Sequence, residues 1–206
     1  MDRRTEPVTF VFNGYENNPI VRMCLKKQPR RILTEKELLP IIRKLRHSKW
    51  AWDNKRYSYV GDELRLYLAS QSEDFLYIDA DVVIENIEDI KMDCCPKNKN
   101  NGTFFRANKN TDWVKYYLNV YETQDVGNDV NYMVFARFPF PIPTQDNIKY
   151  THYFTSFRER WKNRNGSRNH VLLFDAETEY DIRTLHLKDF DEWHYYKGCE
   201  VFFENI

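Results

Sequence analysis

The first third of the chain alternates compact apolar runs with amphipathic segments. Val8–Asn13 is a run of β-branched and aromatic residues that ends at Gly14, which predicts a buried first strand. Pro19–Lys27 carries apolar residues at helical spacing, with its proline in the first turn. Thr34–Glu37 matches a capping box and precedes an apolar stripe of period near 3.6. We therefore expect a strand followed by two helices.

The strongest apolar run is Phe75–Ile84, in which hydrophobic residues lie on both sides of two acids. Such a run predicts one central strand, buried on both faces. Further helices are expected over Asp62–Ser70 and Trp113–Val120, strands over Tyr132–Phe138 and Val171–Phe174, a rigid turn at Phe138–Pro143, and loops over Asn98–Thr103 and Asn163–Asn169. The alternation predicts an α/β fold with a mainly parallel central sheet flanked by helices. We expect one domain over residues 1–206.

Composition narrows the functional classes only slightly. The 206 residues are 42% hydrophobic and 16% aromatic, which is typical of a globular chain. With 31 basic and 31 acidic residues the formal charge is zero, so a global field that attracts polyanions is not expected. The charges are nevertheless uneven, because Lys26–Arg56 holds about eleven Lys and Arg against about three acids. This segment is either a solvated helical face or a positive rim for a phosphorylated ligand.

The cysteines and the hydropathy suggest where the protein works. Cys24, Cys94, Cys95 and Cys199 fit neither a zinc spacing nor a dense disulfide framework. No run reaches the roughly 20 apolar residues of a membrane span, and no apolar leader stands at the start. We expect a protein of the reducing cytoplasm with no transmembrane segment.

Two carboxylates interrupt the strongest apolar run, at Asp79 and Asp81. Side chains two residues apart on a strand point to the same face, so we expect these two to lie together at the strand's carboxyl end. Paired buried carboxylates are costly unless a cation or hydrogen bonds stabilise them. A hard divalent ion, Mn²⁺ or Mg²⁺, is the natural partner of such oxygen ligands. It would neutralise the charge that develops on a departing phosphate group.

Upstream, Asp62 and Arg65 stand three residues apart on one face of the expected helix. Tyr59–Leu68 followed by Phe75–Val82 resembles the sugar-binding core of the DXD-motif glycosyltransferases, which include capsular-polysaccharide and mannosyl transferases and, distantly, the clostridial glucosylating toxins. The segment Asn17–Leu25 is similar to the helix after that family's first strand. The resemblance covers about residues 8–92. Gly61 stands where the family has Ser, and Ser72–Phe75 replaces its two glycines.

The resemblance implies a nucleotide-diphosphate-sugar transferase of the GT-A fold, which uses a UDP- or GDP-sugar and retains the anomeric configuration. Asp62 and Arg65 would bind the donor sugar. Asp79 would contact the ribose and a metal-bound water, and Asp81 would ligate Mn²⁺ or Mg²⁺ directly. By resemblance the acceptor would be a saccharide, with a protein side chain as an alternative. The basic Lys26–Arg56 stretch also leaves room for an anionic acceptor, such as a modified base in DNA.

Further candidates lie before and after this core. Phe12 and Asn13, at the end of the first strand, are expected near the base of the donor, where an aromatic ring could stack. Tyr150–Phe157 is similar to the family's late segment that closes over the diphosphate. On that basis His152 is a candidate metal ligand and Ser156 a candidate donor-binding residue. Asp129 is a candidate catalytic residue facing the acceptor.

Two other functions fit parts of the same pattern. The strand around Asp79 is superficially similar to that of haloacid-dehalogenase-like phosphatases, in which the first aspartate attacks phosphorus. That family has Gly-Thr after its second aspartate, whereas Val82–Val83 follows here. Alternatively, the chain is a noncatalytic module that binds nucleotide sugars. Hydrolysis of nucleotide sugars with Mn²⁺ separates the transferase from both.

Overall fold

The structure is a computed structural model, which describes residues 5–12, 14, 16, 19–96, 103–127, 131–152, 169–170 and 185–186. By its internal contacts the chain divides into two compact units. The first comprises Met1–Asn13, Arg30–Asp79 and Ile84–Tyr150, and the second comprises Gly14–Pro29, Ala80–Val83 and Thr151–Ile206. The single domain expected over the whole chain stays a prediction.

A four-stranded sheet forms the centre of the first unit. Its strands are β1 (Val8–Val11), β2 (Arg31–Thr34), β3 (Phe75–Ile78) and β6 (Phe104–Ala107), in the order β2-β1-β3-β6. β1 pairs in parallel with β2 and β3, whereas β6 runs antiparallel to β3. The expected α/β class is thus confirmed, with a mostly parallel sheet. The carboxyl ends of β1, β2 and β3 consequently share one edge of the sheet.

Aromatic side chains on neighbouring strands hold this sheet together. All four residues of β3 are buried, as the apolar run predicted. The Tyr77 ring lies 4.9 Å from that of Phe10 on β1 and 5.9 Å from that of Phe105 on β6, centroid to centroid. Aromatic pairs at these separations stabilise a sheet beyond the area that they bury. Tyr77 is therefore fixed from both sides.

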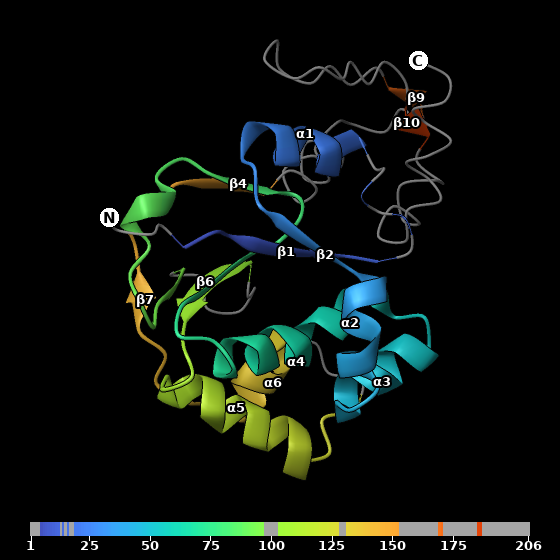
Figure 1. Cartoon of the computed structure of the whole chain (residues 1–206), viewed down its shortest axis with the longest axis vertical. Helices are drawn as coiled ribbons and strands as arrows, with labels where there is room; N and C mark the ends of the chain where they lie inside the picture. Colours follow the sequence, from blue (N-terminus) through green and yellow to red (C-terminus); the bar gives the residue numbers. More distant parts are fainter. Residues whose placement is uncertain are drawn as a thin grey trace. The chain divides into compact units, whose positions relative to one another are not determined.

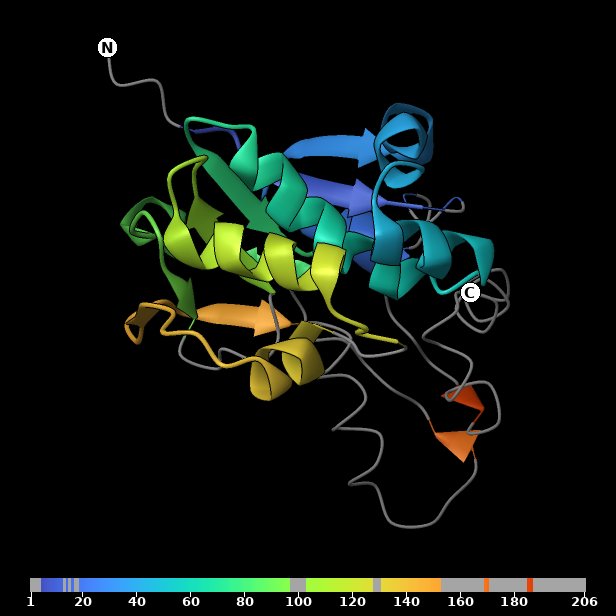
Figure 2. The same ribbon diagram turned by 90° about the horizontal axis from the view of Figure 1, so that it is seen from below.

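The described helices of the first unit lie on one side of this sheet (Figure 1). They are α2 (Glu35–Ile42), α3 (Arg46–Asp53), α4 (Tyr57–Ser70), α5 (Asp112–Thr123) and α6 (Asn131–Arg137). Figure 2 shows α4 and α5 lying side by side, and the two helices are in contact. α4 buries residues around its whole circumference, which is typical of a helix enclosed by other elements.

The capping box expected at Thr34 is present. Thr34 is the N-cap of α2, and its N–H donates to the Glu37 carboxylate at 3.0 Å. Leu38 and Ile42 of the expected stripe are buried against the core. The expected helices Pro19–Lys27 and Trp113–Val120 are confirmed as α1 (Pro19–Lys27) and as part of α5.

Two of the expected strands are wrong. Phe75–Ile84 is not one strand, because β3 ends at Ile78 and a turn containing Ala80 and Asp81 leads into β4 (Val82–Ile84). β4 pairs with β8 (Tyr150–His152) in a separate two-stranded sheet, so the two halves of the run serve different sheets. Aspartates favour such turns because their short side chains hydrogen-bond nearby backbone.

The strand expected over Tyr132–Phe138 is instead a helix, α6, which spans Asn131–Arg137. Its short apolar run fits either element, and α6 buries Val134 and Phe135. The ring of Phe135 packs 4.1 Å from that of Tyr117 on α5. The helix expected at Asp62–Ser70 begins earlier, at Tyr57, and α3 was not expected at all. These differences come from tertiary packing, which a local pattern does not contain.

Smaller elements complete the described chain. A 3₁₀ turn, η2, spans Ile87–Asp89, and β5 (Cys95–Pro96) pairs in parallel with β7 (Thr144–Gln145). In the second unit, α1 buries Val21, Met23 and Cys24, and β9 (Asn169–His170) pairs antiparallel with β10 (Leu185–His186). The expected strand Val171–Phe174, and nearly all of the two expected loops, lie outside the described residues. The helices described are all too short or too polar to cross a membrane.

Candidate functional site

Asp62 and Arg65 form a buried ion pair on α4. They stand three residues apart, which places them on one face of the helix, and the Arg65 Nη2 donates to Asp62 Oδ1. The side chain of each is only 6% exposed. Burial alone lowers the pKa of Arg65, but the charges of Asp62 and Asp79 outweigh it and raise this pKa above its ordinary value. Arg65 is therefore a permanent cation inside the first unit.

Asp79 meets this pair from the carboxyl end of β3. Its Oδ1 lies 3.6 Å from Arg65 Nη1 and accepts a hydrogen bond of 2.7 Å from the Tyr77 hydroxyl. The Arg65 guanidinium also lies over the Tyr77 ring, 5.2 Å from its centroid. The Arg65 guanidinium thus contacts two carboxylates and the face of an aromatic ring. The Asp79 side chain is 26% exposed and is the part of this arrangement most open to a ligand.

Two backbone hydrogen bonds fix the position of Asp79. Its N–H donates to the Thr103 carbonyl at 2.8 Å, and its own carbonyl accepts from Arg30 Nη1 at 3.1 Å. Arg30 is buried at 8% exposure, next to the start of β2. Two residues, one immediately before β2 and one immediately before β6, therefore hold the start of the turn. Such pre-organisation keeps a binding group in place before its ligand arrives.

Tyr77 supplies a neutral donor to Asp79. Burial raises its pKa well above the ordinary value, the charge of Asp79 raises it further, and Arg65 opposes the shift. The phenol accordingly keeps its proton at physiological pH. Sequence reasoning missed Tyr77 and Arg30. Tyr77 could have been found, since it lies two residues before Asp79 and alternation suggests a common side. No sequence signal pointed to Arg30.

Asp81 belongs to the turn and is partly exposed. The expectation that Asp79 and Asp81 share one face of a strand is wrong, because β3 ends before Asp79 and the period of two does not apply in a turn. His152 is the last residue of β8, and its function as a metal ligand stays a prediction. Asn13, Asp129 and Ser156 lie outside the described residues.

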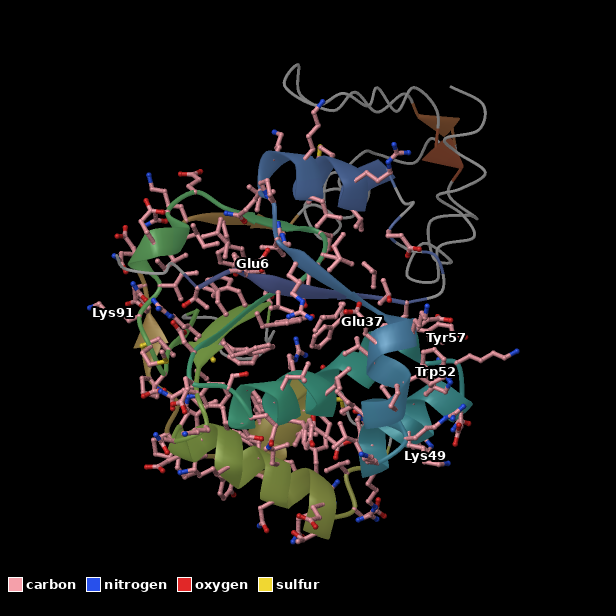
Figure 3. The ribbon with its side chains drawn as sticks, viewed as in Figure 1. Glu6, Glu37, Lys49, Trp52, Tyr57 and Lys91 are labelled. Atoms are coloured by element: carbon pink, nitrogen blue, oxygen red, sulfur yellow. The ribbon has the colours of Figure 1, made fainter. Side chains whose placement is uncertain are left out.

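Phe12 lies just past β1 and is buried at 8% exposure. Its ring packs edge-on against Trp52 of α3 at 6.0 Å, and Trp52 in turn packs edge-on against Tyr57 of α4 at 5.4 Å. Figure 3 labels Trp52 and Tyr57 close together where α3 ends and α4 begins. Both are partly exposed, whereas Phe12 is in the core. The aromatic surface near the end of β1 therefore comes from Trp52 and Tyr57, which the sequence did not single out.

The order of the strands indicates where on the sheet a ligand would bind. β1 leads along the chain to β2 on one side, whereas β3 lies on its other side. In open α/β sheets, ligands bind at the carboxyl ends of the strands where the order reverses in this way. Asp79 follows β3 and Phe12 follows β1, so both residues stand at this point. Within the described residues, no group of three or more His, Cys, Asp or Glu side chains is placed to hold a metal ion.

Compared with models of known protein families and with curated proteins, this chain matches none.

Proposed function

We propose that this protein is a metal-dependent glycosyltransferase of the GT-A type, which moves one sugar from a nucleotide-diphosphate sugar to an acceptor hydroxyl with retention. The observation that carries the proposal is the buried Asp62–Arg65 pair, joined through Arg65 to Asp79 at the carboxyl end of β3. It agrees with the resemblance of Tyr59–Val82 to the DXD-motif glycosyltransferases. It also stands where the strand order favours ligand binding.

In this proposal Asp62 and Arg65 orient the donor sugar. A carboxylate accepts hydrogen bonds from sugar hydroxyls, and a guanidinium donates them with fixed geometry. Because Arg65 already contacts Asp62, Asp79 and the Tyr77 ring, its side chain has little freedom left to lose when a sugar binds. The low exposure of the pair keeps water away from the bond that breaks.

Asp79 and Asp81 would hold Mn²⁺ or Mg²⁺ together with oxygens of the donor diphosphate. The donor set fits a hard cation, since carboxylates are its preferred protein ligands and both aspartates are partly exposed. When bound, the ion would supply Lewis-acid stabilisation of the negative charge on the departing nucleotide diphosphate. Tyr77 would orient Asp79 for this task through the hydrogen bond to its Oδ1.

The nucleotide base would bind near the end of β1. Trp52 and Tyr57 present partly exposed rings there, and aromatic rings of this kind stack on bases. The choice between uracil and guanine depends on hydrogen-bonding groups that these rings do not provide.

A saccharide is the default acceptor by resemblance, with a protein side chain as another possibility. The exposed basic side chains of the α2–α3 region favour, as a second candidate, an anionic polymer such as DNA that carries a hydroxylated base. These side chains are Lys36, Arg43, Lys44, Arg46, Lys49 and Lys55. Such an acceptor would lose affinity steeply as salt is raised, because binding releases counterions.

The test is to incubate the protein with Mn²⁺ and a panel of UDP- and GDP-sugars, and to follow release of the nucleotide diphosphate by mass spectrometry. Slow hydrolysis of one donor, lost with a chelator, would support the proposal. Metal-dependent binding without hydrolysis would indicate a noncatalytic module. If the protein binds none of the donors and hydrolyses none of them, the proposal is overturned.

A further inference from the structure

α4 carries a third buried charge, Glu63, between the two residues of the ion pair. Glu63 is 3% exposed. Its Oε2 accepts a hydrogen bond of 2.8 Å from the backbone N–H of Ser48 on α3. Successive helical residues are rotated by about 100°, so Glu63 faces away from the side of α4 that carries Asp62 and Arg65. The helix is thus held by charged groups on two different sides.

Glu63 caps a helix to which it does not belong. The N-cap residue of α3 is Leu45, which has no side-chain acceptor, and Ser48 is the third residue of the helix. Burial raises the pKa of Glu63 above its ordinary value, although hydrogen bonds from the amide and hydroxyl of Ser48 and from the amides of His47 and Arg46 oppose the shift. The first amides of a helix carry a partial positive charge and are otherwise without intrahelical partners. Glu63 therefore takes the place that an N-cap side chain normally fills.

A second hydrogen bond ties the same two helices together. The Ser48 hydroxyl donates to the Val60 carbonyl at 3.0 Å, one turn before Glu63 on α4. Ser48 therefore contacts α4 twice, once through its backbone and once through its side chain. Together these two bonds oppose rotation of α4 and sliding of α4 past α3.

We propose that Glu63 is a positioning residue, which fixes the rotation of α4 and so holds Asp62 and Arg65 in place against Asp79. Asp62, Glu63 and Arg65 belong to one helical turn, so a rotation that moves Glu63 from the end of α3 also moves Arg65 from Asp79. Burying a carboxylate costs more than burying an apolar side chain that would pack equally well. An orienting function accounts for a carboxylate at this position.

This inference rests on the proposed glycosyl transfer for its kinetic consequence, although not for its structural one. The variants are Glu63→Gln, which keeps the acceptor, Glu63→Ala, which removes it, and Ser48→Ala, which removes the hydroxyl that bonds Val60 and Glu63 but keeps the Ser48 amide. The matched control is Glu37→Ala, since Glu37 is also the carboxylate of a helix cap but belongs to α2 and is exposed.

The kinetic readout is kcat and KM for the donor, at a temperature where circular dichroism shows each variant folded. We expect Glu63→Ala to lower kcat by about 100-fold, the scale of a misplacement near 1 Å. Glu63→Gln should recover most of this loss, and Glu37→Ala should leave kcat unchanged while lowering the melting temperature. A Glu63→Ala variant with the kcat of the wild type would overturn the inference. If Glu63→Ala does not fold, a wild-type kcat in Ser48→Ala would overturn it.

The second readout needs no activity. Nitrogen-15 NMR of arginine side chains, with Arg65 assigned from an Arg65→Lys variant, reports the surroundings of the Arg65 guanidinium. We expect its signals to shift in Glu63→Ala and Ser48→Ala but not in Glu37→Ala. If no donor is used by the wild type, the proposed function fails while this readout still decides the inference. Arg65 signals identical in all variants would overturn it.

Discussion

Arg65 Nη1 lies 3.6 Å from Asp79 Oδ1, and this ion pair joins α4 to the residue that follows β3. Because Arg65 also donates to Asp62, one buried cation links two carboxylates that lie 17 positions apart in the sequence. A buried pair of this kind adds little net stability compared with well-packed apolar residues. The pair is therefore better explained by the proposed function, in which its charges act on a ligand.

Substitutions in the Asp62–Arg65 pair should affect stability and activity differently. Arg65→Met should lower the free energy of unfolding by roughly 3–5 kcal/mol, because it leaves the buried Asp62 carboxylate without its cation. The double variant Asp62→Leu/Arg65→Met should regain much of this stability, since both charges are then gone. Urea denaturation measures both. Activity should be absent from both variants, whatever their stability.

A double variant as unstable as Arg65→Met would contradict this account of the pair. A stable double variant that still turns over donor would contradict its proposed function. The exposed Lys49–Asp53 pair of α3 provides the control. Asp53→Asn should change the free energy of unfolding by less than about 1 kcal/mol, because surface ion pairs contribute little.

Tyr77→Phe tests how Asp79 is oriented. The variant keeps the buried ring and removes only the hydroxyl that donates to Asp79 Oδ1 at 2.7 Å. We expect a loss of about 1–2 kcal/mol in the free energy of unfolding, the usual cost of such a bond. Metal-dependent affinity for the nucleotide should fall by about tenfold, as when an outer partner of a metal ligand is removed.

Isothermal titration with Mn²⁺ and UDP or GDP measures that affinity. Tyr67→Phe is the matched control, because it removes the hydroxyl of a partly buried tyrosine on α4. An unchanged nucleotide affinity in Tyr77→Phe would mean that the hydroxyl has only a structural function.

Asp81→Asn tests the proposed metal site directly. Asparagine has nearly the same shape but no charge, so folding should be intact and the melting temperature nearly unchanged. Turnover and metal-dependent binding of the nucleotide should both be lost, because a hard cation requires charged oxygen ligands. Asp112→Asn, at an exposed position on α5, is the control and should leave both unchanged. Near-normal turnover in Asp81→Asn would rule out the metal assignment.

Local patterns predicted the elements whose signals are contained in a few residues. The Thr34–Glu37 capping box identified the start of α2, and the β-branched run at Val8 identified β1. The i, i+3 spacing placed Asp62 and Arg65 on one helical face, where they are paired. Each of these expectations rests on near neighbours in the chain, and each is confirmed.

The errors arose where distant partners decide the structure. The apolar run from Phe75 to Ile84 gave no sign that its second half would pair with Tyr150–His152. The hydrogen bond of Glu63 is also not predictable from a local pattern, since this residue of α4 caps a different helix, α3. The same holds for Arg30, which reaches Asp79 across 49 positions of sequence. Such contacts follow from the assembled fold.

Asp74, immediately before β3, should make the free energy of unfolding depend on pH. Arg106 Nε donates to Asp74 Oδ1 at 2.9 Å and its Nη2 to Oδ2 at 2.6 Å. These hydrogen bonds hold the pKa of Asp74 below its ordinary value of 3.8, against the opposing effect of burial. The unfolded chain therefore binds more protons than the folded one just below pH 3.8. The stabilisation is complete above that pH and is lost as the pH falls through the folded pKa.

Asp74→Asn should accordingly be less stable than the wild type near pH 6, and the difference should shrink below pH 4. Both side chains are 29% exposed, so screening limits the difference to the order of 1 kcal/mol. Urea denaturation at pH 6, 4 and 3 measures it. Glu73→Gln is the control, since this substitution removes the same charge at the neighbouring position, where the side chain is 79% exposed. A difference between Asp74→Asn and the wild type that stays constant from pH 6 to pH 3 would show that the Arg106 bonds do not favour the charged carboxylate.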